Sequence, residues 1–389
     1  MLISKIFREK FQKEPEKKYW SSGRVNIIGE HSDYHDGLVM PAAINLGITW
    51  VVAKNGDYVR GYTEKFDEVG EFKINQKSRT EFEWMLYLQG VVETLKKWGK
   101  KFGGAEFAIH STIPIGSGLS SSSSLATGFT FILNDLYNLG LNRKQIAKVA
   151  CEAEWWYGTT GGIMDQYCIA NGRAGKAIFL DCRELEHEEI KIPKDLEIVV
   201  FETTIRHKQI NSPFDLRKRQ AREALEILRE KFPSKDIKQL RDVTLAELES
   251  IKSELIRKFG KTEGNIIFKR ARHPITENER VLKMKKALIK RDFSEIGRLL
   301  DECYNSLKND YEVSCEEIDK AIEVAKTIEG LVGTRMVGGG FGGCTINLVK
   351  RGTSHHFAGE IEEKFRKETG IKGNAYICNP FDGLKELKM

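Results

Sequence analysis

The most informative stretch of this sequence is Ile113-Pro-Ile-Gly-Ser-Gly-Leu-Ser-Ser-Ser-Ser-Ser124. It follows the apolar run Phe107 to Ser111, which is typical of a short strand, and it precedes Ser124 to Leu136, where apolar residues recur at helical spacing. Gly116 and Gly118 allow the backbone to approach an anion and to adopt positive φ. The serines add hydroxyls and backbone N–H groups at a helix N-terminus, where partial positive charge collects. The segment therefore predicts a phosphate-binding loop.

Three alternatives to a phosphate-binding loop exist for this segment. An ordinary helix capped by serine stays open, although one serine would suffice for capping. A Walker loop is excluded, because the chain holds no G-x-x-x-x-G-K-[ST] string. A dinucleotide fingerprint is disfavoured as well, since Asp135 lies inside the helical pattern and not at the end of a second strand.

The rest of the chain predicts a mixed α/β (α+β) fold with two domains, at residues 1–195 and 196–389. Its 389 residues suit two domains, and apolar and charged fractions of 40% and 30% are those of a folded protein. Long charged amphipathic helices are expected from about Ser212 to Glu329. Another helix is expected at Trp84 to Trp98, and strands at Arg24 to Ile28, Val39 to Ala43, Ile48 to Ala53, Ala174 to Leu180, Leu196 to Glu202, Thr334 to Val337 and Thr345 to Val349.

Charge and cysteine content narrow the functional classes. The net charge is +6, but Lys and Arg are interleaved with Glu, so we expect solvated helix faces and no nucleic-acid site. Seven scattered cysteines without a CxxC pair predict reduced thiols in the cytoplasm. No run approaches the ~20 apolar residues of a membrane span, so we expect no membrane association.

The segment Gly23 to Gly37 concentrates hydrogen-bonding side chains directly after an apolar strand. Such density suits recognition of a polyhydroxylated ligand. A metal site is an alternative, because His31 and His35 are four residues apart, although the HExxH pattern is absent. A solvated turn without function is another.

Two further segments carry candidate chemistry. Asp165 follows Gly161-Gly-Ile-Met, a setting that favours partial desolvation and a role as proton acceptor unless a cation opposes the rise in its pKa; a helix N-cap is the alternative. Gly338-Gly-Gly-Phe-Gly-Gly343 lies between two strand patterns, which argues against a Rossmann loop. We expect either a tight β-turn or, more in keeping with its five glycines, a loop close to a bound ligand.

Taken together, these segments resemble the galactokinases, within the family of galactose, homoserine, mevalonate and phosphomevalonate kinases. The resemblance rests on Gly23-Arg-Val-Asn-Ile-Ile-Gly-Glu-His-Ser-Asp-Tyr34, on Pro114 to Ser122 and on Gly333-Thr-Arg-Met-Val-Gly-Gly-Gly-Phe-Gly-Gly-Cys-Thr345. Similar segments also occur at Gly162 to Gln166, Asp181 to Glu186, Arg270 to His273 and Asn309 to Cys315.

The resemblance implies a two-domain small-molecule kinase fold with its active site in the cleft between the domains. It implies ATP as phosphate donor, galactose as acceptor at the anomeric hydroxyl, and Mg²⁺ as cofactor. Asp165 matches the carboxylate that takes the proton from the sugar, and Arg24 matches the cation beside it.

The remaining site residues are implied in the same way. Sugar contacts are implied for Glu30, His31, Asp33, Gly162 and the position of Phe214. ATP contacts are implied for Trp84, at the adenine, and for Gly116, Ser117, Gly118, Leu119, Ser120, Ser121 and Ser122. The resemblance implies Ser122 and Glu154 on the magnesium side and Gly338, Gly339 and Gly340 in a loop near the ligand.

The sequence departs from the galactokinase pattern at Phe214, where a Tyr is usual, and the stretch from Glu154 to Asp165 is one residue short. A kinase for galacturonate, N-acetylgalactosamine or arabinose is thus an alternative, although a second carboxylate on the sugar would be repelled by Glu30. A non-catalytic sensor of sugar and ATP is another, but its serine loop would be expected to differ. We expect a monomer.

Overall fold

The computed structural model describes residues 2–114, 116–206 and 213–389. They form two compact units, the first from residues 1–24, 42–176 and 380–389, and the second from residues 25–41 and 177–379. This division differs from a single boundary after residue 195. Long-range strand pairing is the reason: β13 (Leu384–Leu387) returns to pair with β1 (Lys17–Asn26), and β2 (Leu38–Val39) pairs with β7 (Lys176–Asp181).

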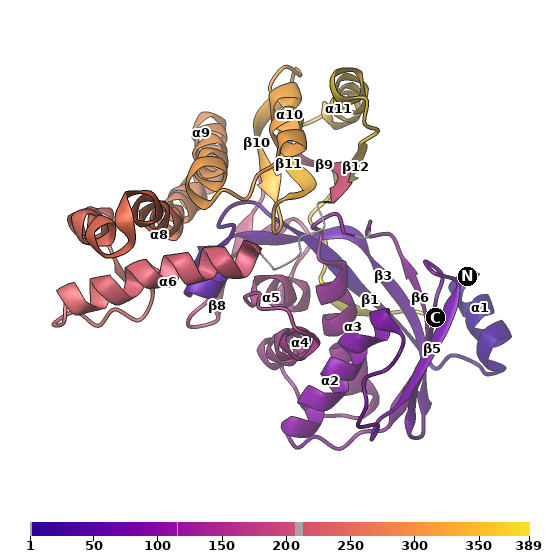
Figure 1. Cartoon of the computed structure of the whole chain (residues 1–389). Helices are drawn as coiled ribbons and strands as arrows, with labels where there is room; N and C mark the ends of the chain where they lie inside the picture. The colour runs from indigo at the N-terminus through magenta and orange to yellow at the C-terminus, as the bar shows by residue number, and fades with distance from the viewer. Residues whose placement is uncertain (1, 115, 207–212) are drawn as a thin grey trace. The chain divides into compact units, whose positions relative to one another are not determined.

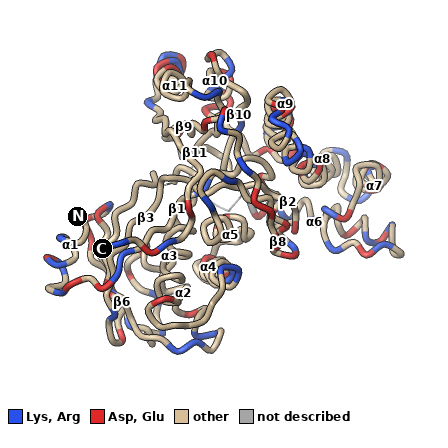
Figure 2. Tube along the Cα trace, turned by 180° about the vertical axis from the view of Figure 1, so that it is seen from behind, with Lys and Arg blue, Asp and Glu red and all other residues tan. Residues whose placement is uncertain are grey.

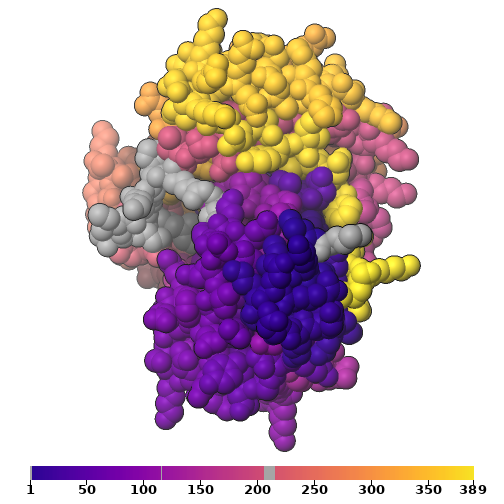
Figure 3. All heavy atoms as spheres, turned by 90° about the vertical axis from the view of Figure 1, so that its right-hand side faces the viewer, coloured from indigo at the N-terminus to yellow at the C-terminus, as the bar shows by residue number. Residues whose placement is uncertain are grey.

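The first unit is built on a six-stranded sheet of order β13-β1-β3-β6-β4-β5. The central strands are β3 (Pro41–Asn55), which unites two predicted strands, and β6 (Gly104–Ser111). β4 (Tyr58–Thr63) runs parallel to β6, and β5 (Glu68–Lys73) pairs antiparallel with β4. In Figure 3 the last residues of the chain, in yellow, lie beside the indigo N-terminal segment, in keeping with the pairing of β13 and β1.

Alternation along β3 explains why helices cover both faces of this sheet. Val51 and Ala53 pack with Phe7 of α1 (Leu2–Phe11), whereas Trp50 stacks near Phe129 of α3 (Ser121–Leu136) on the other face. Side chains of neighbouring strand residues point to opposite faces, so one strand serves both cores. Figure 1 shows α2 (Leu86–Lys97), α3, α4 (Arg143–Tyr157) and α5 (Met164–Asn171) gathered on the face opposite α1.

The second unit contains an antiparallel four-stranded sheet of order β10-β11-β9-β12. Its strands are β10 (Leu331–Val337), β11 (Gly342–Lys350), β9 (Leu196–Arg206) and β12 (Asn374–Cys378). α10 (Glu316–Ala325) and α11 (Ser354–Thr369) pack on it, with Phe201, Phe357 and Phe365 buried between. The strands expected at 196–202, 334–337 and 345–349 are thereby confirmed.

A helical layer fills the stretch in which charged helices were predicted. It consists of α6 (Pro213–Lys231), α7 (Leu245–Ser250), α8 (Lys252–Lys290) and α9 (Phe293–Ser306), followed by the π-helical turn η4 (Leu307–Tyr311). Gly260, at φ 81° and ψ 164°, breaks α8 into two helical parts. A small sheet of order β2-β7-β8, with β8 at Glu186–Lys191, completes the unit.

Surface charge follows the expected interleaved pattern. Figure 2 shows blue and red segments alternating along the helices of the second unit. Neighbouring turns carry opposite charges, as in the pairs Arg298–Glu295, Lys320–Glu323 and Lys364–Glu360. All seven cysteines are free thiols. Among the described residues, no helix is both long and apolar enough to cross a membrane.

Candidate functional site

The serine-rich segment forms the loop between β6 and α3 that the sequence predicts. Gly116 and Gly118 have φ of 69° and 75°, the left-handed region that favours glycine. Ser120 occupies the N-cap of α3, yet among the described residues its hydroxyl makes no capping bond. Interpretation of the segment as an ordinary serine-capped helix is therefore wrong. The first-turn N–H groups of this 16-residue helix remain oriented toward the loop, as an anion site requires.

Asp165 lies in the first turn of α5, where it is bonded to Arg24 of β1. Arg24 Nε donates to Asp165 Oδ1 and Nη2 donates to Oδ2, both at 2.6 Å. Such a two-pronged ion pair is a strong and directional contact. The N-cap of α5 is Ile163, so the alternative of a capping Asp165 is wrong.

The same two residues contact the serine loop. Arg24 Nη1 donates to the Gly118 carbonyl at 2.6 Å, and the Ser120 hydroxyl donates to Asp165 Oδ2. The Arg24 side chain is 5% exposed and that of Asp165 is 22% exposed. A partly exposed carboxylate in an ion pair thus lies beside the loop, and segments 45 to 141 residues apart in sequence meet here.

Glu154 and the start of α3 form an oxygen-rich cluster in the same unit. Gln166 Nε2 donates to Glu154 Oε1 at 2.9 Å, and the Ser123 hydroxyl also bonds the carboxylate. Burial raises the pKa of Glu154 to about 7, against the opposing effect of these two hydrogen bonds. Ser123, for which the sequence suggested no role, therefore bonds the carboxylate that was predicted to act with Ser122.

A cavity of about 780 Å³ in the first unit joins the serine loop to an aromatic cluster. Gly116, Ser121 and Ser122 line one part of it, and Trp84 lines another. Trp84 Nε1 donates to Glu68 Oε2 at 2.7 Å, which fixes the plane of the indole. The lining also includes Phe66, Phe82, Tyr87 and Tyr157, and this combination of flat apolar walls with a hydroxyl- and amide-rich end suits a nucleotide.

The polar segment after β1 lies in the second unit and is buried. Glu30 and His31 are 3% and 4% exposed. The Glu30 carboxylate pairs with Arg335 of β10 at 2.9 Å. His31 Nδ1 and the Tyr34 hydroxyl are 2.8 Å apart, and Tyr34 in turn contacts the hydroxyl of Tyr311 at 2.9 Å. Since these groups are fixed within the unit, the alternative of a solvated turn is wrong.

Electrostatics makes the histidines of this segment neutral. Burial is the main cause that lowers the pKa of His31 to about 3, and the nearby His273 and His35 contribute to the same shift. Asp33 begins the 3₁₀ turn Asp33–His35 and is partly exposed. Among the described residues, no group of three or more His, Cys, Asp or Glu side chains is arranged to hold a metal ion, which leaves the His31–His35 metal site without support.

The glycine-rich loop connects β10 and β11 as a hairpin. Gly340 has φ 84°, and a Cβ there would lie 2.3 Å from the Val313 carbonyl oxygen. The Phe341 N–H donates to that same oxygen at 2.7 Å. The expectation of a tight turn is confirmed; the proximity of Gly338, Gly339 and Gly340 to a ligand stays a prediction.

Two other predicted positions are less informative. Gly162 lies between α4 and α5, where its carbonyl oxygen is 3.6 Å from Cys151 Sγ. Phe214 belongs to the first turn of α6, but its side chain lies outside the described residues.

The sequence interpretation missed three residues that organise the second unit. They are Arg335, His273 and Tyr311, which contact Glu30, the Glu30 backbone and Tyr34, respectively. Each belongs to a segment that resembled the galactokinases, and that resemblance was the available signal. Because their partners are 243 to 305 residues away in sequence, spacing within the motifs could not reveal the contacts.

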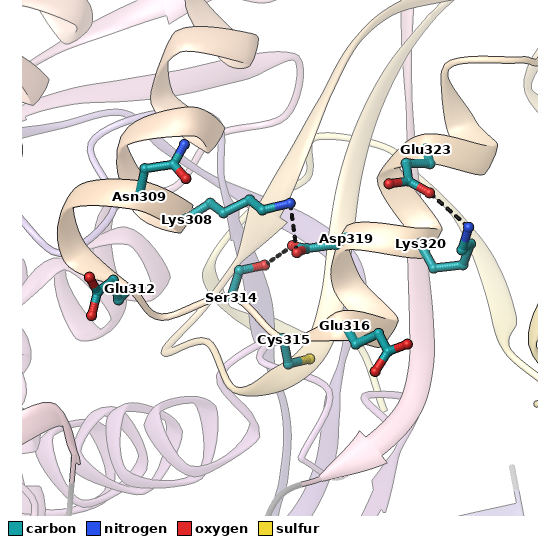
Figure 4. Close-up of a pocket in the computed structure, with 9 residues that line it drawn as sticks. All are labelled: Lys308, Asn309, Glu312, Ser314, Cys315, Glu316, Asp319, Lys320 and Glu323. Carbon is teal, nitrogen blue, oxygen red and sulfur yellow. Dashed lines mark hydrogen bonds and ion pairs between the residues drawn. The ribbon is translucent and has the colours of Figure 1, made fainter.

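Another cavity, of about 560 Å³, lies at the start of α10 (Figure 4). Its charged residues pair with one another, as Lys308 does with Asp319 and Lys320 with Glu323, both at 2.8 Å. None of the predicted site residues lines it.

Comparison with known proteins gives three family matches along the chain. The galactokinase galactose-binding signature matches residues 5–54, the GHMP kinases N terminal domain matches residues 86–173, and the GHMP kinases C terminal domain matches residues 284–367. The galactokinase of Clostridium acetobutylicum is 35% identical over 99% of this chain and 98% of its own. This chain belongs to the galactokinase family.

Other members agree. The galactokinase of Actinobacillus succinogenes is 35% identical over 98% of this chain and 97% of its own. The crystal structure of Lactococcus lactis galactokinase complexed with galactose is 32% identical, covers 99% of this chain and 98% of that one, and superposes with a TM-score of 0.91. A mevalonate kinase from Methanococcus jannaschii, at 18% identity and a TM-score of 0.63, shares the fold. The expected mixed α/β kinase fold is confirmed.

Proposed function

We propose that this chain transfers the γ-phosphate of ATP to the anomeric hydroxyl of galactose, giving galactose 1-phosphate and ADP. One observation carries the chemistry: Asp165 is bonded both to Arg24 and to Ser120 of the phosphate loop. A proton acceptor is thereby adjacent to a cradle for the transferred group. The galactokinase family members and the galactose complex of one of them support the choice of sugar.

Asp165 is the proposed acceptor of the proton from the sugar hydroxyl. Phosphoryl transfer needs little covalent help, so positioning and electrostatics supply most of the rate. Arg24 holds the carboxylate through two hydrogen bonds and would place positive charge beside the attacking oxygen. Oδ2 accepts from both Arg24 and Ser120, so the hydroxyl of the sugar would use the remaining lone pair of Oδ1, which accepts from Arg24 Nε.

The nucleotide is proposed to occupy the cavity of the first unit. The indole of Trp84 would stack on the adenine, and the loop from Gly116 to Ser122 would hold the phosphates through its amides and hydroxyls. The left-handed φ of Gly116 and Gly118 supports this placement, because it exposes consecutive N–H groups on one side of the backbone.

Magnesium is the proposed cofactor, and the residues present fit it. Mg²⁺ binds through one or two protein oxygens together with substrate phosphates. Glu154 is a buried carboxylate with a raised pKa, and a bound cation would lower that pKa. Ser122 lies at the phosphate end of the cavity. When bound, the ion would neutralise charge on the β- and γ-phosphates.

The sugar is proposed to contact Glu30, His31, Asp33 and Gly162, with the loop Gly338 to Gly340 close to the bound ligands. The Glu30 carboxylate favours a neutral hexose, because the carboxylate of galacturonate would be repelled. Phe214 offers no hydroxyl to the sugar, a loss of about 0.5–1.5 kcal/mol if neighbours compensate. We further propose that the chain acts as a monomer and that it is located in the cytoplasm. The seven free thiols support the cytoplasmic location.

The test is a panel of sugars in an ADP-release assay, with and without Mg²⁺. Galactose should give the highest kcat/KM, and omission of Mg²⁺ should abolish turnover. Faster turnover of galacturonate, N-acetylgalactosamine or arabinose would reassign the substrate. Binding of galactose and ATP without any turnover would instead indicate a sensor.

A further inference from the structure

A fully buried guanidinium lies against the segment that carries Glu30. Arg335 is 0% exposed. Its Nε donates to the Ile27 carbonyl at 2.9 Å, and its Nη2 donates to the Asn26 carbonyl. Its Nη1 donates to Glu30 Oε2 at 2.9 Å and also to its neighbour, the Met336 carbonyl. One side chain of β10 therefore holds both the backbone and the carboxylate of this segment.

The charge of Arg335 is expensive to bury and is balanced mainly by Glu30. Burial alone would lower the pKa of Arg335, but the Glu30 carboxylate raises it above its usual value. An ion pair of this kind contributes little net stability compared with apolar residues of similar size, so its retention is better explained by what it positions. Arg335 itself has no exposed surface with which to touch a substrate.

The backbone of the same segment is held separately by α8. The Gly29 N–H donates to Glu277 Oε1 at 2.8 Å, and His273 Nε2 donates to the Glu30 carbonyl at 2.9 Å. Gly29 has φ 96°, and a Cβ there would lie 2.7 Å from the Leu38 carbonyl oxygen, so no side chain fits. Glu30 thus has little freedom to move on its own.

This arrangement commits one carboxylate oxygen of Glu30 and leaves the other for a ligand. Oε2 is bonded to Arg335, whereas within residues 2–114, 116–206 and 213–389 no group donates to Oε1. A carboxylate oxygen with a fixed direction favours a hydroxyl donor and disfavours a second carboxylate.

We propose that Arg335 is a specificity-determining positioning residue, which fixes the Glu30 carboxylate so that its second oxygen faces a hydroxyl of the sugar. The inference rests on the proposed function, in which Glu30 contacts the sugar. It assigns the direction of this carboxylate to a residue that does not itself touch the sugar.

The test compares galactose with the monodeoxygalactose that the wild type rejects most strongly, in the wild type, Arg335→Lys, Glu30→Gln and the double variant. Lysine retains the charge, but it lacks the separate guanidinium N–H groups that donate to Glu30 and to the carbonyls of residues 26 and 27 at the same time. The ratio of the two kcat/KM values should fall by about tenfold or more in Arg335→Lys, because a site built for a hydroxyl strongly rejects the analogue that lacks it. The change should lie in the KM of galactose, with the KM of ATP within about twofold of the wild type.

The double variant should have about the same ratio as Glu30→Gln, because the two residues act as a unit. Arg270→Lys is the matched control. Arg270 is 2% exposed and bonds the Asp310 carbonyl and Glu312, so its replacement removes a buried fork away from Glu30 and should leave the ratio unchanged.

Several results would overturn the inference. They are an unchanged ratio in a folded Arg335→Lys, or an equal loss for both sugars together with a raised KM for ATP. If Arg335→Lys does not fold, Arg335→Gln is measured in the same way, and failure of both to fold would show that Arg335 serves folding and not specificity. If the wild type does not phosphorylate galactose, the proposed function fails first and independently of Arg335.

Discussion

At the scale of single residues, Asp165 illustrates how hydrogen bonds can position the carboxylate that is proposed as the base. It accepts two hydrogen bonds from Arg24 and one from Ser120. Because these three bonds fix the direction of the carboxylate, the contribution expected of Asp165 rests on its orientation.

Replacement of this carboxylate should be costly. Asp165→Asn keeps the shape of the side chain but removes the proton acceptor, and we expect kcat to fall by about 10² to 10⁴. Steady-state ADP release, with melting temperature as a check on folding, measures the effect. Asp135→Asn is the matched control, since Asp135 is also held by hydrogen bonds in the first unit, from Lys17 and Tyr19, and should leave kcat almost unchanged. Near-normal turnover in Asp165→Asn would remove the base from the mechanism.

Replacement of Trp84 should weaken the binding of ATP and leave the binding of galactose unchanged. Stacking of a base on an aromatic ring contributes about 1–3 kcal/mol, so Trp84→Leu should raise the KM for ATP by about tenfold while the KM for galactose is retained. Trp98→Leu is the control, because Trp98 lies at the end of α2 and does not line the cavity. A raised KM for galactose in Trp84→Leu, without an effect on ATP, would place the nucleotide elsewhere.

At the scale of elements, the β10–β11 hairpin shows that neighbouring glycines can have different reasons. Gly340 needs its left-handed φ and the space beside Val313, whereas a Cβ on Gly339 would meet no described heavy atom within 4 Å. Gly340→Ala should therefore lower the free energy of unfolding by more than about 2 kcal/mol, and Gly339→Ala by less than about 1 kcal/mol. Urea titration of the two variants provides the comparison. Equal losses would mean that the hairpin tolerates a side chain at Gly340.

Element prediction worked where one segment carries its own signal. The strand-loop-helix from Phe107 to Leu136 could be predicted because glycines, serines and helical periodicity occur in one continuous run. Asp165 and Arg24 could be recognised from their motifs. Their direct contact depends on the tertiary placement of α5 next to β1, which the motifs do not encode. Arg335 was missed for the same reason, since a buried ion pair leaves no periodic pattern at either residue. β5 and β8, rich in Lys and Glu, are edge strands without the apolar alternation on which the interpretation relied.

At the scale of the whole molecule, protonation couples the stability of the second unit to pH. His31, His35 and His273 are all buried, and burial lowers their pKa values to about 3, 3 and 4. An unfolded histidine titrates near 6.5, so below that pH the unfolded chain binds more protons than the folded one. Stability should therefore be fully present above about pH 6.5 and be lost as pH falls toward 4.

His273→Gln isolates one member of this set. Glutamine can still donate to the Glu30 carbonyl and accept from Ser306, but it does not titrate. As pH falls from 6 to 4.5, the free energy of unfolding of this variant should rise relative to that of the wild type by about 1 kcal/mol per pH unit. Urea unfolding at a series of pH values measures this difference, and His356→Gln, at an exposed position, should show no such trend. Parallel pH profiles for His273→Gln and the wild type would contradict the assignment.

The predicted site residues are distributed over both units. The carboxylate, its arginine and the phosphate loop lie in the first unit, whereas Glu30, His31 and the glycine loop lie in the second. Neither a family signature nor a change in composition could locate the boundary between the units. Residues 25–41 belong to the same unit as residues 177–379, and residues 380–389 belong to the same unit as residues 1–24, so each unit combines segments that are far apart in sequence.

The most direct test of the central claim follows the fate of the sugar atom itself. Galactose labelled with ¹³C at its first carbon is incubated with the purified chain, ATP and Mg²⁺, and the product is examined by NMR. The account predicts ¹³C–³¹P coupling at that carbon, appearing in step with ADP. Phosphate attached at any other carbon, or ATP consumption that leaves galactose unchanged, would contradict it.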